Sequence, residues 1–167
     1  MDYQDTYLEQ NDFKTDYEIE RGKPMPSKNH GKIQTRLSAS LINKYFDQYD
    51  VETEVALELT SGKGTPDIMI STPTLDDWMT DEIRVSTPPI TTIEILSPKQ
   101  SIDELKDKII SIYFPGGVKS AWLIVPPFQT VYVMTPDKKV LTFTSGIIRD
   151  PVTGIEIDMK EIFNKRV

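Results

Sequence analysis

Residues 90 to 125 constrain the fold more than any other part of the sequence. Ile90–Leu96 is rich in β-branched residues, which predicts a strand. Residues 101–113 repeat apolar side chains at helical spacing and predict a helix that ends at Pro115-Gly116-Gly117. Ala121–Val125 is a continuous apolar run, typical of a central strand. If the two strands are parallel, this segment is a right-handed strand–helix–strand crossover within a helix-covered sheet.

Around this unit, the sequence predicts a second helix and further strands. Apolar residues recur every fourth position between His30 and Tyr49, which predicts an amphipathic helix. Val51–Leu59 alternates apolar and mostly acidic residues and predicts a strand, and Pro66–Ser71 predicts the next strand after a turn. The other predicted elements are a small hairpin at 17–26, a long connector at 72–89, a hairpin formed by 130–134 and 140–143, and short strands with a brief helix at 146–167.

These elements predict a single domain over residues 16–167, of the α/β (α+β) class. We expect a central mixed β-sheet flanked by helices, with an added C-terminal hairpin. Residues 1–15 are polar and acidic and predict an N-terminal lead-in. No internal repeat or linker indicates a second domain, and the length is sufficient for a substantial hydrophobic core.

The composition limits the compartment and the partners of the protein. The sequence contains no cysteine, which excludes disulfides and thiolate metal sites and fits a cytoplasmic location. No apolar run approaches the ~20 residues that span a bilayer, and the acidic first residues do not form a signal peptide, so no membrane association is expected. The net charge of -7 counts against broad electrostatic attraction to nucleic acid, although it leaves room for a local basic groove.

Two acidic residues are isolated in apolar strands, where a carboxylate needs a charged partner or a bound cation. Asp67 lies in Pro66–Ser71, and Glu94 lies in Ile90–Leu96. The isoleucines of these strands, Ile68 and Ile70 in one and Ile93 and Ile95 in the other, point to the opposite face, so the two carboxylates converge if the strands are neighbours. Two carboxylates with a backbone carbonyl and waters suit Mg²⁺ or Mn²⁺. The alternative is that Asp67 caps the preceding turn and Glu94 pairs with a cation.

Several motifs in this region occur in a familiar order. Pro66-Asp67 is followed by Ile93–Pro98, by a helix that ends near Gly117-Val118, and by the strand with Ala121-Trp122. Their order and spacing resemble the Uma2 family, which belongs to the PD-(D/E)XK, or restriction-endonuclease-like, superfamily. Further similar segments are 17–22, 26–30 and 153–163.

This resemblance implies a restriction-endonuclease-like core and a metal-dependent endonuclease that hydrolyses DNA phosphodiester bonds with a metal-activated water. It implies Asp67, Glu94 and the backbone carbonyl of Ile95 as ligands of Mg²⁺ or Mn²⁺. It also implies DNA as the partner and a homodimer, because restriction-like nucleases often act as dimers to cut two strands.

The catalytic lysine of the superfamily lies two residues after the second acid, and Leu96 occupies that place here. The resemblance implies that a lysine of the following helix has taken over, which leaves Lys106 and Lys108. These two lie on opposite shoulders of the apolar stripe, so only one can easily face the site. Lys108 is favoured by its place before Tyr113, although its spacing from Tyr113 departs by one residue from the family pattern. The alternative for Lys108 is an ordinary i,i+4 pair with Glu104.

Four further residues are candidate accessory residues of this site. His30, the only histidine, starts the first long predicted helix, and Gln34 follows one turn later. Both could face the site, although a lone histidine is more often structural. Glu54 could add a third carboxylate from the strand before the first acid, although a solvated strand face is the simpler interpretation. Ser97 could orient the second acid through its hydroxyl, or simply end the strand.

Three functions fit these patterns. The first is the metal-dependent DNA endonuclease that the resemblance implies, in which Lys63 and Lys99 at strand ends could contact the phosphate backbone. The second is a catalytically inactive restriction-like fold that acts as a binding or interaction module, which Leu96 and the negative charge favour. The third is metal-dependent hydrolysis of another phosphoester, which local sequence does not distinguish from the first.

Overall fold

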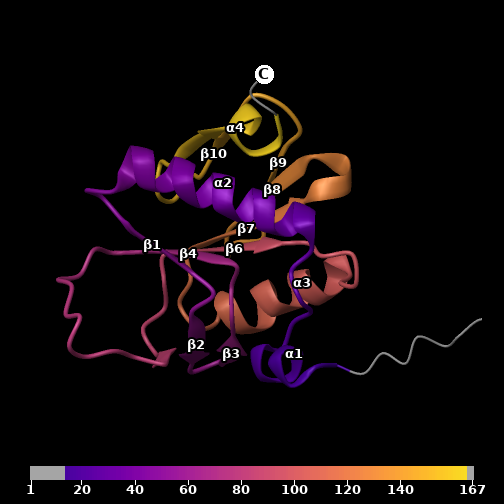
Figure 1. The fold of residues 1–167 in the computed structure, drawn as a ribbon. Coiled ribbons are helices and arrows are strands. Elements are labelled where there is room, and N and C mark those ends of the chain that lie inside the picture. The colour runs from indigo at the N-terminus through magenta and orange to yellow at the C-terminus, as the bar shows by residue number, and fades with distance from the viewer. Residues whose placement is uncertain (1–13, 165–167) are drawn as a thin grey trace, which may run out of the picture.

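A six-stranded mixed sheet forms the centre of the protein in a computed structural model that describes residues 14–164. Strands β6 and β7 are parallel, and every other neighbouring pair is antiparallel. Helices cover both faces of the sheet (Figure 1), which confirms the predicted fold class. In spatial order the strands are β1 (Asp50–Thr53), β4 (Ile68–Ser71), β6 (Thr91–Ile95), β7 (Ser120–Val125), β8 (Thr130–Met134) and β9 (Val140–Phe143).

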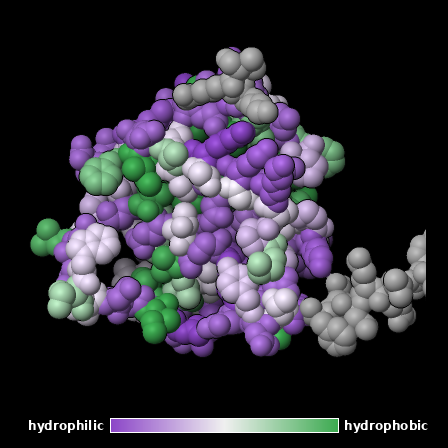
Figure 2. Space-filling model, in the orientation of Figure 1, coloured by the Kyte–Doolittle hydropathy of each residue, from purple (hydrophilic) through white to green (hydrophobic). Residues whose placement is uncertain are grey.

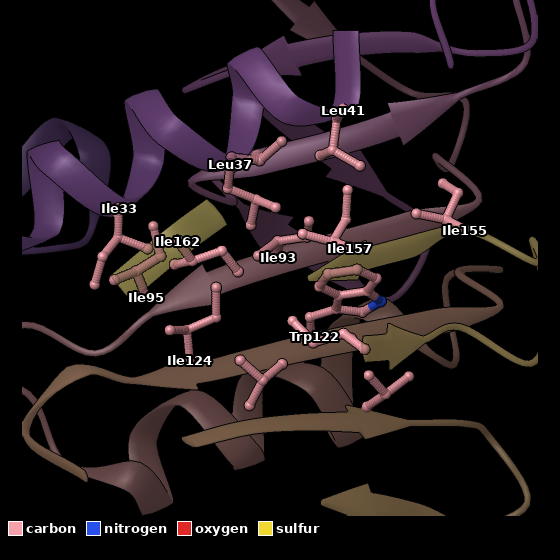
Figure 3. Close-up of a cluster of buried hydrophobic side chains, with 14 of the residues drawn as sticks. Ile33, Leu37, Leu41, Ile93, Ile95, Trp122, Ile124, Ile155, Ile157 and Ile162 are labelled. Atoms are coloured by element: carbon pink, nitrogen blue, oxygen red, sulfur yellow. The ribbon is translucent and has the colours of Figure 1, made fainter. Parts of the chain in front are cut away.

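One face of the sheet packs against α2 (Lys28–Tyr45) and α4 (Met159–Phe163). The predicted four-residue repeat of α2 forms its buried stripe, and Ser27 caps the helix by accepting the backbone N–H of His30. Isoleucines of the central strands meet this stripe around the indole of Trp122 (Figure 3). The side chains that point to this face alternate along each strand, as one buried face requires.

The opposite face packs against α3 (Ile102–Lys108) and its continuation η1 (Ile109–Tyr113). Ser101 caps α3 by accepting the N–H of Glu104, as its position predicts. The helix connects β6 to the parallel strand β7, which confirms that this segment is a parallel strand–helix–strand connection. This second core contains Leu105, Met69 and Leu123 and lies on the same face as the two strand acids.

The prediction of a hairpin at 17–26 is wrong, because residues Asp16–Arg21 form the short helix α1. Thr15 and Glu18 form a reciprocal capping box, and Gly22 ends the helix in the left-handed conformation. These local caps outweigh four residues of apolar–acidic alternation, which is too short to decide the structure. The rest of the predicted lead-in, residues 1–13, lies outside the described residues.

The prediction of one strand at Val51–Leu59 is also wrong in one respect. The chain breaks at Glu54, whose φ of 60° is left-handed, and β2 (Ala56–Leu59) joins a separate sheet. That sheet also contains β3 (Gly62–Gly64), at the predicted turn, and β5 (Arg84–Val85), within the predicted connector. The break redirects the Glu54 side chain towards the end of β4, which alternation along one strand could not predict.

The connector between β4 and β6 carries large apolar side chains at the surface. Leu75, Trp78, Met79 and Ile83 are each at least 90% exposed. Figure 2 shows apolar atoms along the outer edge of this loop, at the left of the view. Acidic residues are interleaved with them in the sequence, so this loop is poorly suited to phosphate contacts.

The C-terminal region closes the first core. The predicted hairpin is confirmed as β8 and β9, with Pro126–Phe128 forming the short helical turn η2 before it. Strands β10 (Ile147–Arg149) and β11 (Glu156–Asp158) pair with each other and lead into α4. Within residues 14–164, no helix combines the length and apolarity that crossing a bilayer requires.

Candidate active site

Asp67 and Glu94 lie directly opposite each other on neighbouring strands. The antiparallel register of β4 and β6 pairs Ile68 with Ile93, and continuing it by one residue brings the two acids together. The isoleucines belong to the core under α2, so the acids project towards the α3 face. Each carboxylate is only 1% exposed. The structure therefore unites the two acids that the sequence singled out, inside the protein.

Asp67 is surrounded by hydrogen-bond donors. Lys23 Nζ lies 2.5 Å and His30 Nε2 lies 3.0 Å from Oδ1, and the backbone N–H of Ile95 donates to Oδ2 over 2.7 Å. Burial raises the pKa of Asp67, but His30 and Lys23 lower that pKa by more, so the carboxylate is ionised. In an extended strand the carbonyl of a residue points to the same side as its N–H, so the Ile95 carbonyl points to the β4 side of β6.

Glu94 has different partners, supplied by the helical segment of the crossover. The hydroxyl of Tyr113 donates to Oε1 over 2.5 Å, and Lys108 Nζ lies 3.4 Å from the same oxygen. Burial raises the pKa of Glu94, and the nearby Asp67 adds to the increase, against the opposing effect of Lys108. Burial and Glu94 together raise the pKa of Tyr113 well above its ordinary value, so the phenol stays protonated and keeps donating.

The π-helix η1 explains the unexpected spacing of Lys108 and Tyr113. One of its hydrogen bonds runs from the Phe114 N–H to the Ile109 carbonyl, five residues earlier in the chain. A π turn takes about one residue more than an α turn, so residues five apart lie on the same side. Lys108 and Tyr113 consequently both reach Glu94, despite the one-residue departure from the family pattern.

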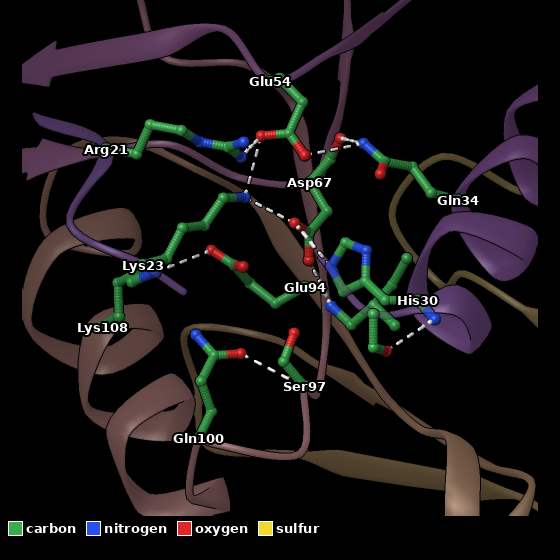
Figure 4. A network of polar contacts seen from close by, with 12 residues as sticks. Arg21, Lys23, His30, Gln34, Glu54, Asp67, Glu94, Ser97, Gln100 and Lys108 are labelled. Atoms are coloured by element: carbon green, nitrogen blue, oxygen red, sulfur yellow. Dashed lines mark hydrogen bonds and ion pairs between the residues drawn. The ribbon is translucent and has the colours of Figure 1, made fainter. Parts of the chain in front are cut away.

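A second group of charged residues supports Asp67 from the N-terminal side (Figure 4). Lys23 Nζ also lies 3.2 Å from Glu54 Oε2, and Arg21 forms an ion pair with that same carboxylate. Gln34 Nε2 donates to Glu54 Oε1 over 3.0 Å and to the backbone carbonyl of Asp67 over 2.8 Å. Two carboxylates, Asp67 and Glu54, and three basic side chains, Arg21, Lys23 and His30, are thus linked by contacts within one cluster.

Sequence reasoning missed Lys23, as well as Arg21 and Tyr113, as residues of the site. Lys23 lies 44 residues before Asp67 and follows directly on Gly22, in a segment predicted as a hairpin turn. Its side chain is buried, and this burial lowers the pKa of Lys23, although Glu94 and Asp67 oppose the shift. The only sequence signal is its place just before the segment that leads into α2.

The other predicted residues divide into two groups. His30, Gln34 and Glu54 contact Asp67 or one another within the cluster, as described above. Lys106 does not reach it, because its ammonium lies 2.7 Å from Asp103 on the solvent side of α3. Ser97 is buried nearby, but its backbone N–H donates to Gln100 Oε1, and its hydroxyl makes no hydrogen bond to Glu94 among the described residues.

A pocket of about 400 Å³ lies next to the lysines that contact the two acids, and neither acid forms part of its lining. Lys23 and Lys108 line it, and each of them contacts one acid of the pair. The charged residues of its wall are Lys14, Lys23, Lys99, Lys108, Glu18 and Glu104. The lining of this pocket is basic, with four lysines against two glutamates, but Lys23 and Lys108 also compensate the two buried acids. An anionic ligand in the pocket would therefore share these two lysines with Asp67 and Glu94.

Comparison with known proteins identifies the family. Residues 3–160 match the Uma2 family, described as "Putative restriction endonuclease". The chain belongs to the Uma2 family. This confirms the resemblance on which the sequence interpretation depends.

A solved structure supports the same assignment of this Uma2 protein. It is the crystal structure of "a putative nuclease belonging to DUF820" from Anabaena variabilis ATCC 29413, with 25% sequence identity and a TM-score of 0.72. The match covers 84% of this chain and 83% of that one. No curated protein matches the sequence. Family and fold together support a nuclease function, and hence a nucleic acid substrate.

Proposed function

We propose that this Uma2 protein is a metal-dependent endonuclease that hydrolyses DNA phosphodiester bonds at Asp67 and Glu94. The observation that carries this proposal is the position of the two acids, buried opposite each other beside a lysine-lined pocket. Burying two carboxylates on neighbouring strands opposes folding unless cations compensate their charge. A protein gains little from this arrangement unless the pair binds something.

The donor set fits a small hard cation. Asp67, Glu94 and the Ile95 carbonyl are oxygen donors, and the Lys23 ammonium already stands against Asp67 as a substitute cation. Within residues 14–164, no group of three or more His, Cys, Asp or Glu side chains forms a ready metal cage, so the carbonyl and waters would complete the coordination. Mg²⁺ or Mn²⁺ bound there would supply an activated water and neutralise charge on the phosphate.

The surrounding residues have separate tasks in this proposal. Lys108 lies between Glu94 and the pocket, where it would orient the attacking water or stabilise the negative charge that develops on the phosphate. Tyr113 holds the Glu94 carboxylate by its hydrogen bond, and His30 holds Asp67. Gln34 fixes the Asp67 backbone, which keeps the acid at the end of β4.

The second candidate function is an inactive interaction module with the same fold. Each Asp67 oxygen already accepts a hydrogen bond, and the net charge of -7 opposes binding to DNA. This candidate requires that no metal supports cleavage and that Glu94→Gln leaves binding to a partner unchanged.

A plasmid assay separates the two candidates. Supercoiled DNA is incubated with the full chain in Mg²⁺, in Mn²⁺ and in chelator, and nicking is followed on gels. We expect the wild-type chain to nick the plasmid only when a metal is present. The rate of nicking should fall at least 100-fold in Asp67→Asn and in Glu94→Gln. The matched control is Glu58→Gln, which changes the same charge at a surface ion pair with Lys63. Full cleavage by folded Asp67→Asn and Glu94→Gln proteins would show that the site is elsewhere.

We further propose a homodimer that acts in the cytoplasm, as the resemblance implies. Two copies would place one carboxylate pair against each DNA strand. Light scattering of the purified protein at micromolar concentration measures this directly, and a monomer mass with and without a DNA duplex would refute the dimer.

A further inference from the structure

We propose that Lys23 is a built-in cation of the carboxylate cluster, and that a divalent ion must displace its ammonium in order to bind. This inference rests on the proposed function, in that it takes Asp67 and Glu94 as the metal ligands. It adds a residue that controls whether those ligands are available.

The contacts of Lys23 put its ammonium where a metal would be needed. Nζ lies 2.5 Å from Asp67 Oδ1 and 3.2 Å from Glu54 Oε2, and only 8% of the residue is exposed. Mg²⁺ binds oxygen at about 2.0–2.1 Å, so an ion on the same oxygen would lie within about 5 Å of the ammonium. Two cations at that separation inside a protein repel each other strongly, because the low dielectric screens them poorly.

The remaining contacts allow Lys23 to leave without orphaning its partners. Arg21 still neutralises Glu54, and Gln34 still donates to that carboxylate. Asp67 keeps the Ile95 N–H and His30, and gains the metal. The exchange replaces a single positive charge by a double one at the Asp67 carboxylate.

The structure also offers the displaced ammonium a destination. Lys23 already lines the basic pocket, together with Lys108, so another side-chain rotamer would carry Nζ into that pocket. It lies in the irregular segment between α1 and α2, which follows the left-handed Gly22. In the pocket, the ammonium would face the phosphate of a bound nucleic acid instead of Asp67.

Mn²⁺ affinity tests this inference. Isothermal titration compares the wild-type chain with Lys23→Gln and with Lys106→Gln, which removes the same charge from a surface pair with Asp103. We expect Lys23→Gln to bind Mn²⁺ at least tenfold more tightly than wild type, and Lys106→Gln to match wild type. Equal or weaker binding by folded Lys23→Gln would overturn the proposal.

A second measurement on the wild-type chain covers the case in which Lys23→Gln fails to fold. Acetylation of each lysine is followed by mass spectrometry with and without saturating Mn²⁺. We expect Lys23 to be modified severalfold faster with Mn²⁺, and the partly exposed Lys106 to be unaffected. An unchanged rate at Lys23 while Mn²⁺ is bound would also overturn the proposal.

A Glu94→Gln arm distinguishes failure of this inference from failure of the proposed function. If Glu94→Gln abolishes Mn²⁺ binding while Lys23→Gln leaves the affinity unchanged, only the role of Lys23 is refuted. Absence of Mn²⁺ binding in both the wild type and Lys23→Gln would refute the metal chemistry of the proposed function as well.

Discussion

At the scale of single residues, the candidate site depends on the packing of its side chains as well as on their charges. Tyr113 is fully buried and reaches Glu94 only because Gly64 on β3 leaves room for its ring. A Cβ at Gly64 would lie 2.8 Å from Tyr113 Cε1. This glycine therefore acts on the candidate site through packing, although it contacts neither acid.

Gly64→Ala is expected to lower the free energy of unfolding by about 1–3 kcal/mol, because overpacking displaces a buried ring that cannot swing away. Urea unfolding measures the loss. Gly31→Ala is the matched control, since Gly31 lies in α2 and a Cβ there meets nothing within 4 Å. It should stabilise the protein by about 0.5–1 kcal/mol, as Ala replaces Gly in a helix. Equal effects of the two substitutions would contradict the packing argument.

At the scale of elements, the π-helix is the feature that joins sequence and site. It adds one residue between Lys108 and Tyr113 and still keeps both on Glu94. An insertion into a regular α-helix would instead rotate the following residues by about 100°. The crossover thus absorbs an extra residue at η1 without losing its contacts.

Deletion of Ser111, an exposed residue of η1, should convert the segment to α-helix and preserve the contacts with Glu94. Lys108 and Tyr113 would then be four residues apart and still share a face. We expect a change of less than about 1 kcal/mol in the free energy of unfolding. Deletion of Asp107, equally exposed but in the regular part of α3, should cost about 2–5 kcal/mol, because it turns Leu105 or Ile109 out of the core. Chemical unfolding measures the stability of both deletion variants. Equal losses of stability would show that the π-helix does not absorb the deleted residue.

At the scale of the whole molecule, a third buried acid has a structural task. Asp150 accepts hydrogen bonds from Ser120 and Trp122 of β7, and from the backbone N–H groups of Val152 and Thr153. It therefore ties the central sheet to the turn between β10 and β11. Its burial resembles that of the candidate site acids, but its partners are neutral donors of the fold.

Asp150→Ala is expected to destabilise the protein by about 3 kcal/mol or more, since it leaves several buried donors without an acceptor. Thermal and urea unfolding measure the effect. Asp137→Ala, at the exposed β8–β9 turn, should change stability by less than about 0.5 kcal/mol. Asp150→Ala with wild-type stability would show that other groups close the C-terminal region.

Charge is also distributed unevenly over the molecule, with a basic pocket on a chain of net charge -7. We expect DNA binding to depend on few phosphate contacts, and the logarithm of affinity to fall by about 0.9 for each contact per tenfold rise in salt. Lys99→Gln should weaken binding and reduce that slope by about one contact. Fluorescence anisotropy with a labelled duplex gives both values. Lys63→Gln, which removes a charge paired with Glu58 outside the pocket, should alter neither; a matching effect would place the DNA elsewhere.

The sequence alone was enough to predict the crossover, the amphipathic α2 and the common face of Asp67 and Glu94. These features depend on periodicity and alternation, which are local properties of the chain. The tertiary structure alone decided that Lys23 contacts Asp67, that Glu54 turns towards it, and that a π-helix brings Tyr113 to Glu94. Lys23 and Tyr113 reach their acids from distant segments, and Glu54 depends on one left-handed residue within a regular alternation. Local patterns carry no signal for such contacts, because the charge of a buried acid does not specify which distant cation will compensate it.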